Sequence, residues 1–217
     1  MRNIQLIILI ALFVLFIPCH IHAQSISAQF SIKELNDSLF QYISGKSYKS
    51  GCPVKRSDLR LLIVTHYDFS GNVCRGELIC NTLIAQDLID IFSTLFAEHY
   101  PIEKIRLIDY YNADDNASMS DNNTSCFNYR TISGSAKISR HGLGMAIDIN
   151  PRYNPEVKTH NGKTIISPSN GVDYKDRTKP FPHKINHADL CYKLFTQHGF
   201  RWGGNWKYSK DYQHFEK

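Results

Sequence analysis

The chain places a histidine and an aspartate seven residues apart, His141 and Asp148, in the segment SRHGLGMAIDIN at residues 139–150. Gly142 and Gly144 lie between them, and the aspartate belongs to an apolar run typical of a strand. A buried carboxylate without a partner is costly in free energy. The segment is therefore either a half-exposed surface strand, or both side chains bind the same positive charge.

A second group of ionisable residues lies near the C-terminus, in WGGNWKYSKDYQHFEK, where Asp211 precedes His214 by three positions. A catalytic zinc site uses three protein ligands from His, Asp or Glu and leaves one position open. His141, Asp148 and His214 fit that set, with one zinc ion per chain. Asp211 would then take a proton from the water that the metal acidifies. Two histidines and an aspartate also suit other first-row divalent metals.

Two separated signatures resemble those of one enzyme family. The pattern S-x-H-x-x-G-x-A-x-D is typical of the zinc D-Ala-D-Ala carboxypeptidases and dipeptidases, a family that includes the L-alanyl-D-glutamate endopeptidases of phage endolysins and bacilli. HGFRWGGNW at residues 198–206 and DYQHFE at 211–216 resemble the C-terminal signature of the endolysin-like branch. The resemblance covers about residues 80–217. The first signature is matched by Ser139, His141, Gly144, Ala146 and Asp148.

The resemblance implies a role for each residue of the site. It implies His141, Asp148 and His214 as zinc ligands, and Asp211 as the general base that activates water and returns the proton to the leaving amine. Other carboxypeptidases of the family carry Glu at the base position, whereas the endopeptidase branch carries Asp. Arg130 matches the arginine that the family places against the substrate, where a guanidinium stabilises an oxyanion.

Three further residues are candidates for substrate contact. Ser139 is either a turn residue or a group that contacts substrate. Trp202, like Trp206, either packs in the core or lines a groove for a sugar-peptide. Arg177 is a second basic residue that could bind a substrate carboxylate.

Elements of regular structure are predicted along the whole chain. Capping-box spacing at Ser31 and an apolar face predict a helix over residues 31–43. Apolar, β-branched runs predict strands at 59–67 and 73–79 joined by a turn, and Asn81 is predicted to cap a helix that ends before residue 101. Further strands are predicted at 104–110, 145–149, 200–202 and 212–216, and a helix at 187–197 that ends at Gly199.

Two long polar segments complete the organisation. Residues 112–123 are predicted to form a loop too polar to be buried, and residues 151–182 show little periodicity. The pattern favours an α+β fold, one domain with a small antiparallel sheet and flanking helices. The resemblance implies the zinc fold shared by D,D-peptidases and the hedgehog signalling domain.

The N-terminal residues 1–23 are predicted to be a secretory signal peptide. Arg2 supplies the positive charge, residues 4–17 are almost entirely apolar yet short for a membrane span, and Ala23 ends a suitable cleavage site. Lipidation at Cys19 is disfavoured because bulky residues and a proline precede it. We therefore expect a secreted or periplasmic protein without a membrane span after cleavage, in which an N-terminal segment at 24–79 packs on a catalytic domain at 80–217.

Charge and cysteine content limit the function classes. The formal net charge is +5, but the basic residues are scattered, so no nucleic-acid surface is predicted. Five cysteines would follow the signal peptide, which leaves at least one thiol unpaired, and their spacing does not favour a cysteine-built zinc site. Cys74 and Cys80 flank a segment that could close as a hairpin. The five are Cys52, Cys74, Cys80, Cys126 and Cys191.

We predict a monomeric zinc metallopeptidase that hydrolyses an amide bond in peptidoglycan stem peptides. Removal of a terminal D-alanine and cleavage between L-Ala and D-Glu both remain open. The alternative is a zinc-stabilised cell-wall binding module without catalysis, because a fold does not by itself imply turnover. Asp211 discriminates between them, since a pure binder does not need a carboxylate beside an open metal position.

Overall fold

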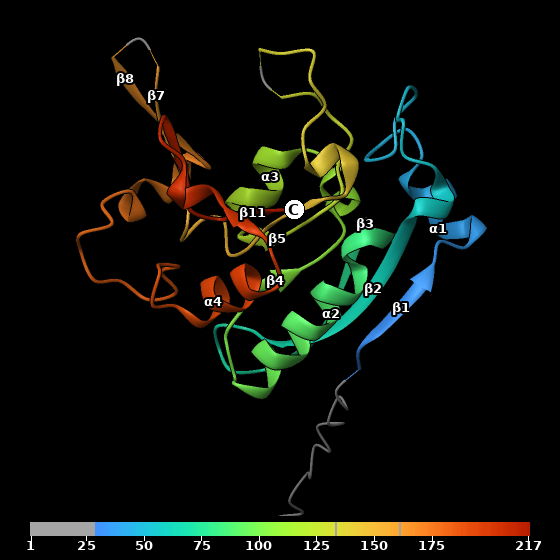
Figure 1. Cartoon of the computed structure of the whole chain (residues 1–217), viewed down its shortest axis with the longest axis horizontal. Helices are drawn as coiled ribbons and strands as arrows, with labels where there is room; N and C mark the ends of the chain where they lie inside the picture. The colour runs from blue at the N-terminus through green and yellow to red at the C-terminus, as the bar shows by residue number, and fades with distance from the viewer. Residues whose placement is uncertain (1–28, 133, 161) are drawn as a thin grey trace, which may run out of the picture.

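The computed structural model describes residues 29–132, 134–160 and 162–217 (Figure 1). The signal peptide predicted at 1–23 lies outside these residues. The described part is mixed α/β, with small sheets and a few helices. In chain order the strands and α-helices are β1 (Ser31–Glu34), α1 (Asp37–Ile43), β2 (Leu59–Tyr67), β3 (Val73–Asn81), α2 (Thr82–Ala97), β4 (Lys104–Ile105), α3 (Asp115–Ser120), β5 (Asn123–Thr124), β6 (Ala146–Asp148), β7 (Glu156–His160), β8 (Lys163–Ser167), α4 (Leu190–Gln197), β9 (Arg201–Trp202), β10 (Ser209–Asp211) and β11 (His214–Glu216). Short 3-10 turns are η1 (Arg56–Asp58), η2 (Ile108–Tyr111), η3 (His141–Leu143), η4 (Ser169–Tyr174) and η5 (Gly203–Asn205).

The first sheet has the antiparallel order β1-β2-β3 and packs against α2 (Figure 1). The turn between β2 and β3 forms because the Asp68 carboxylate accepts the backbone N–H groups of Ser70 and Asn72, both at 2.8 Å. The Asn81 side chain caps α2 by accepting the N–H of Leu83 at 3.1 Å, as predicted. The apolar stripe of α2 is buried in the main core: Ile84, Ala85, Leu88, Ile91, Phe92 and Leu95.

A second sheet, in the antiparallel order β6-β11-β9, lies on the same core and carries the residues of the predicted metal site. Phe215 of β11 stacks on Phe195 of α4 at 4.4 Å between ring centroids. Gly199 follows α4 with a positive φ of 82°, as predicted for the residue after a helix end. Every strand of this sheet is short, so its position is fixed by side-chain packing on α4 and α2.

The third sheet, β10-β7-β8, includes a hairpin that projects from the body of the molecule (Figure 1). The hairpin pairs with the rest of the chain through β10, whose Asp211 lies opposite Glu156 of β7. It was not predicted, because residues 151–182 read as an irregular excursion. β4 and β5 form a separate parallel pair.

Two predicted elements are shorter in the structure than predicted. The helix predicted at 31–43 begins only at Asp37, because residues 31–34 pair as β1 with the edge of β2 and Asn36 caps the helix instead of Ser31. The strand predicted at 104–110 is limited to Lys104–Ile105 and continues as η2. In the first segment, pairing with β2 makes residues 31–34 a strand and not the first turn of the helix. In the second, only Lys104 and Ile105 pair with β5, so the strand ends there.

The prediction that residues 112–123 are too polar to be buried holds for most of the segment but is wrong for Ser118, Asn122 and Asn123, which are buried. The segment contains α3, and Asn123 is fully buried. Its side chain accepts the N–H of Arg106 at 2.8 Å and donates to the Arg106 carbonyl and to Ser118 Oγ, both at 3.0 Å. A polar side chain whose hydrogen bonds are all supplied by the protein can be buried at little cost.

The cysteines of the described residues form no disulfide. Cys74 and Cys80 lie on the same strand, β3, so the hairpin expected between them is wrong. Burial raises the pKa of the Cys126 and Cys191 thiols well above the usual value, so they behave as small apolar core residues.

Residues 29–79 and the rest of the described chain share a core. One apolar cluster combines Leu59 and Ile79 with Leu107 and Phe127, and the boundary expected between residues 79 and 80 falls inside β3. The division into two units stays a prediction. Among the described residues, every helix is too short or too polar to cross a bilayer.

A glycine substitution tests how tightly the site is tied to the first sheet. Gly144 has a φ of +67°, and a Cβ there would lie 2.8 Å from the backbone nitrogen of Asn81, which donates to the Gly144 carbonyl. Gly71 also has a positive φ, but its Cβ would meet nothing. Gly71→Ala is expected to cost about 1–2 kcal/mol of unfolding free energy from backbone strain alone. Gly144→Ala should cost more, because the clash adds to the strain.

Chemical denaturation of both variants in excess chelator measures these two free energies of unfolding. Equal losses in the two variants would show that the contact between Gly144 and Asn81 is not tight.

Candidate metal centre

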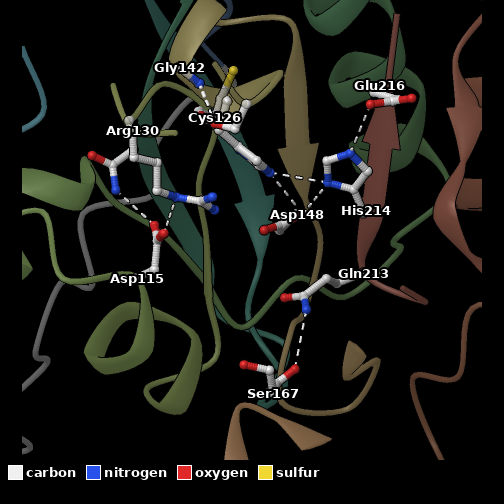
Figure 2. Close-up of polar contacts among 12 residues, drawn as sticks. Asp115, Cys126, Arg130, Gly142, Asp148, Ser167, Gln213, His214 and Glu216 are labelled. Atoms are coloured by element: carbon white, nitrogen blue, oxygen red, sulfur yellow. Dashed lines mark hydrogen bonds and ion pairs between the residues drawn. The ribbon is translucent and has the colours of Figure 1, made fainter. Parts of the chain in front are cut away.

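The register of β6 and β11 brings two of the predicted ligands together. Asp148 and His214 are direct antiparallel partners on these strands, and both are buried (Figure 2). Their nearest atoms, Asp148 Oδ1 and His214 Nδ1, are 3.0 Å apart. On its other side Asp148 exchanges backbone hydrogen bonds with Ser125, so its main chain is fixed from two directions.

The third predicted ligand, His141, approaches from the 3-10 turn η3 before β6. The Ser139 hydroxyl accepts the N–H of Gly142 at 2.9 Å and so shapes this turn. Gly142 itself has no room for a side chain, since a Cβ would lie 2.9 Å from the carbonyl oxygen of Arg130. The turn can therefore approach the Arg130 backbone closely enough for His141 to reach Asp148 and His214.

The three side chains converge on one point. His141 Nε2 lies 3.1 Å from His214 Nδ1 and 3.3 Å from Asp148 Oδ1. Ligand atoms about 2.0–2.1 Å from a tetrahedral ion lie about 3.3 Å from one another, so the spacing fits three corners of such a site. Among the described residues these three form the cluster able to hold a metal ion.

Neighbouring groups hold both imidazoles in the tautomers that a metal requires. His141 Nδ1 lies 2.7 Å from the Cys126 carbonyl, to which it donates, which leaves Nε2 unprotonated. His214 Nε2 lies 3.5 Å from the Glu216 carboxylate (Figure 2). Arg201 pairs with the same carboxylate at 2.8 Å. One ring nitrogen of each histidine, Nε2 of His141 and Nδ1 of His214, thus faces Asp148.

The site is electrostatically prepared for a cation. Burial opposes the charge of Asp148, but His141 and His214 hold its pKa below the usual range. Burial also disfavours a charged His214, yet the hydrogen bonds to Asp148 and Glu216 outweigh it and raise the His214 pKa to about 10. The carboxylates thus stabilise a positive charge at this point, which a divalent ion would supply more fully than a proton.

Asp211, the predicted base, lies at the end of β10 beside this cluster. Burial, and next the charge of Asp148, raise the pKa of Asp211 to about 7. Its Oδ1 atom is enclosed and has no hydrogen-bond partner in the described part of the chain. The turn η5 packs directly on it, because a Cβ on Gly203 would lie 2.6 Å from the Asp211 carbonyl oxygen. Asp211 is therefore a carboxylate with an unused acceptor near the metal position.

Arg130 lies across the cavity from β11, where it forms an ion pair with Asp115 of α3 (Figure 2). Asp115 also accepts a hydrogen bond from Asn128 at 2.8 Å. The pair holds the guanidinium at the cavity wall, where it can meet a substrate oxygen.

One cavity of about 960 Å³ connects these groups. Its lining includes the three cluster residues together with Asp211, Arg130 and Ser139. The cavity has room for several residues of a peptide, and a metal ion in the cluster would face it.

Two of the residues predicted to contact substrate lie elsewhere. Trp202 is buried in the core and donates its indole N–H to the Tyr212 carbonyl at 2.9 Å. The Arg177 guanidinium is held by Asn154 Oδ1 at 3.0 Å and by the Ile185 carbonyl at 2.8 Å. Neither residue lines the cavity of the metal centre, so this arrangement gives no support to a substrate role for them.

Sequence reasoning missed three residues of the site: Asp115, Glu216 and Arg140. Glu216 follows His214 by two positions on one strand, a spacing that places both side chains on the same face and could have indicated it. Asp115 carries no such signal, because α3 was predicted as a loop. Arg140 is adjacent to His141 in sequence and lines the cavity.

Metal binding tests this geometry. The wild type is expected to bind one divalent ion per chain, and Asp148→Asn should abolish high-affinity binding because the anionic ligand is lost. Glu216→Ala should weaken the affinity by about 10–100-fold, since it no longer fixes the His214 tautomer. Competition with a chromophoric chelator, using Zn²⁺ and Co²⁺ as probes, measures both effects.

Glu34→Ala is the control, because this glutamate lies exposed on β1, away from the cavity. Wild-type affinity in Glu216→Ala would show that the contact at 3.5 Å does not orient the histidine.

Comparison with known proteins agrees with this geometry. Residues 133–217 match a family model described as D-alanyl-D-alanine carboxypeptidase. The matched region contains the three cluster residues and Asp211, whereas Arg130 lies just before it. No curated protein and no solved structure gave a match to the chain. The family match agrees with the resemblance seen in the two sequence signatures: residues 133–217 of the chain are similar to the D-alanyl-D-alanine carboxypeptidase family of peptidases.

Proposed function

We propose that this protein is an exported zinc metallopeptidase that hydrolyses an amide bond in peptidoglycan stem peptides. The observation that carries the proposal is the position of Asp211, a carboxylate with a raised pKa and a free acceptor atom beside a convergent His-Asp-His cluster. A protein that only bound its ligand would gain nothing from such a group. The family match over residues 133–217 supports the peptidase chemistry.

Zinc is the metal that best fits the donor set. Two neutral imidazoles and one carboxylate at tetrahedral spacing, facing a cavity, match the ligand type of catalytic zinc sites. When bound, zinc would supply Lewis acidity to the scissile carbonyl and to the attacking water.

The protons are managed by the protein. In the proposed reaction the water oxygen bonds to the carbonyl carbon while Asp211 accepts the water proton. The carbon–nitrogen bond then breaks, and Asp211 returns the proton to the leaving amine. A carboxylate with a pKa near 7 can both accept and donate a proton at neutral pH.

Arg130 would stabilise the negative charge that develops on the carbonyl oxygen. Its ion pair with Asp115 fixes the guanidinium before substrate binds, so little reorganisation is needed during the reaction. Both bond choices remain within this proposal: removal of a terminal D-alanine and cleavage between L-Ala and D-Glu.

Export remains part of the proposal, through the signal peptide predicted at residues 1–23. A chain secreted or delivered to the periplasm would meet peptidoglycan there. The mildly basic net charge of +5 is compatible with a polyanionic wall.

Digestion of purified peptidoglycan and of a defined stem pentapeptide by the protein starting at Gln24 tests the proposal. The zinc-loaded wild type is expected to release D-alanine or to split the peptide between L-Ala and D-Glu. Asp211→Asn should lower the rate by about 10²–10⁴-fold while zinc stays bound, because the general base is lost. Mass spectrometry of the products and zinc analysis of both proteins provide the two readouts.

Asp176→Asn removes the same charge outside the cavity and should keep full activity. Removal of zinc by a chelator should abolish turnover, and added zinc should restore it. A folded, zinc-loaded wild type that yields no product from either substrate would favour the binding module.

A further inference from the structure

A second pocket lies against the chain segment that carries Asp211. Along residues 209–213 the side chains alternate between two faces, as they do along a strand. Ser209, Asp211 and Gln213 line the cavity of the metal centre, whereas Lys210 and Tyr212 line a separate pocket of about 330 Å³. The two pockets have no lining residue in common. A molecule bound in the second pocket would therefore lie on the opposite face of β10 from Asp211.

The charged residues that line the second pocket are all basic. Its lining includes Arg177, Lys184 and Lys210 and no aspartate or glutamate of the described residues. Within the same part of the chain, none of the three has a carboxylate oxygen within 4.0 Å. Asp176, the neighbour of Arg177 in sequence, instead faces Lys179 at 3.8 Å. The excess of positive charge thus comes from the side chains alone.

Neutral oxygen atoms hold two of these cations in place without cancelling their charge. The Arg177 guanidinium donates to the Ile185 carbonyl at 2.8 Å. Lys184 Nζ donates to the carbonyls of Lys179, at 2.8 Å, and of Arg177, at 3.2 Å. The Lys210 ammonium forms no hydrogen bond with the described residues and is available to a ligand. Two of the three positive charges are therefore fixed in position before any anion arrives.

Aromatic rings keep the cations close to one another. The Arg177 guanidinium lies 4.3 Å from the centre of the Tyr212 ring and 4.9 Å from that of Phe181. Lys184 Nζ lies 5.0 Å from the centre of the same Phe181 ring. Burial lowers the pKa of Arg177 to about 10. A partly buried guanidinium without a carboxylate is costly in free energy, and an anion in the pocket would reduce that cost.

We propose that Arg177, Lys184 and Lys210 form an anion site that binds a phosphate group, either free or as the monoester of a small molecule. A carboxylate has one negative charge and would leave two of the three cations unbalanced. A phosphate monoester carries about 1.5–2 negative charges at neutral pH, and lysines bind it as point charges. The pocket volume is at the lower end of the range of small-molecule sites, about 300–1,000 Å³. The site does not depend on the proposed peptidase reaction.

Calorimetric titration of the protein starting at Gln24 tests the site. The probes are inorganic phosphate, glycerol 3-phosphate and, as a singly charged comparison, acetate. The variants are Lys184→Gln, Lys210→Gln and the double variant. Lys210→Gln removes no hydrogen bond within the described residues, so its folding should be unaffected. Lys207→Gln is the matched control, because it removes one charge from an exposed lysine outside both pockets.

The wild type is expected to bind both phosphates and to bind acetate more weakly. Each single substitution should weaken phosphate binding by about 10–100-fold, the range of a charged hydrogen bond, and Lys207→Gln should bind as the wild type does. Tighter binding of glycerol 3-phosphate than of inorganic phosphate would assign the site to an organic monoester, and the reverse order to free phosphate. No binding of either phosphate, or equal binding by Lys210→Gln and the wild type, would overturn the proposal.

The metal centre requires its own control, because a bound metal ion also attracts anions. Asp148→Asn, which is expected to lose high-affinity metal binding, is titrated with the same probes. Phosphate binding that persists in this variant and is weakened in Lys210→Gln supports the second pocket. Binding that is lost in Asp148→Asn but kept in Lys210→Gln would place the anion at the metal centre and exclude the site. Turnover is not measured, so failure of the peptidase proposal would leave this result unchanged.

Discussion

The structure of the site depends on one buried carboxylate, that of Asp148. It lies on β6, whose other residues are apolar core, where an unpaired charge would be unstable. Two imidazoles surround the carboxylate, one from the opposite strand and one from the preceding turn, and each has one ring nitrogen toward it. The three side chains point at one position, where a cation could contact all of them. Most features of the surrounding chain make this convergence possible.

The three side chains can converge because backbone segments approach one another closely at three glycines. Gly142 lets the turn lie on Arg130, Gly144 itself lies on Asn81 just before α2, and Gly203 lets η5 lie on Asp211 and His214. Each glycine removes a side chain at a point where two segments distant in sequence touch. The predicted metal ligands are thereby fixed by main-chain contacts, which are less adaptable than side-chain packing.

The sequence predicted the site better than the elements around it. His141 and Asp148 are close in sequence and separated by glycines, so their convergence is a local property that a pattern can indicate. The helix from Asn81 was equally local, since its cap and stripe lie in one segment. β1 was missed because its partner, the edge of β2, is about thirty residues away and no local pattern specifies it.

For the β7–β8 hairpin and for two side chains, the sequence contained an indication that other properties of the segment obscured. The Asn-Gly pair at residues 161–162 is typical of a two-residue hairpin turn, but the polar composition around it hid the hairpin. Arg177 and Trp202 had the chemistry of substrate-binding residues, yet the chain uses them to hold backbone carbonyls. Composition shows what a side chain can bind; only the fold decides whether it meets protein or ligand.

The proposed base and the metal ligands belong to different sheets. Asp211 ends β10, which pairs with the projecting hairpin, whereas Asp148 and His214 sit on β6 and β11 over the main core. Two residues of chain join the halves. The proposed base and the predicted metal site can therefore change separately in evolution. A change in the sheet of the hairpin would affect Asp211 first and the predicted metal ligands less. The same scaffold can thus pass from enzyme to metal-stabilised receptor, or back, without rebuilding its core.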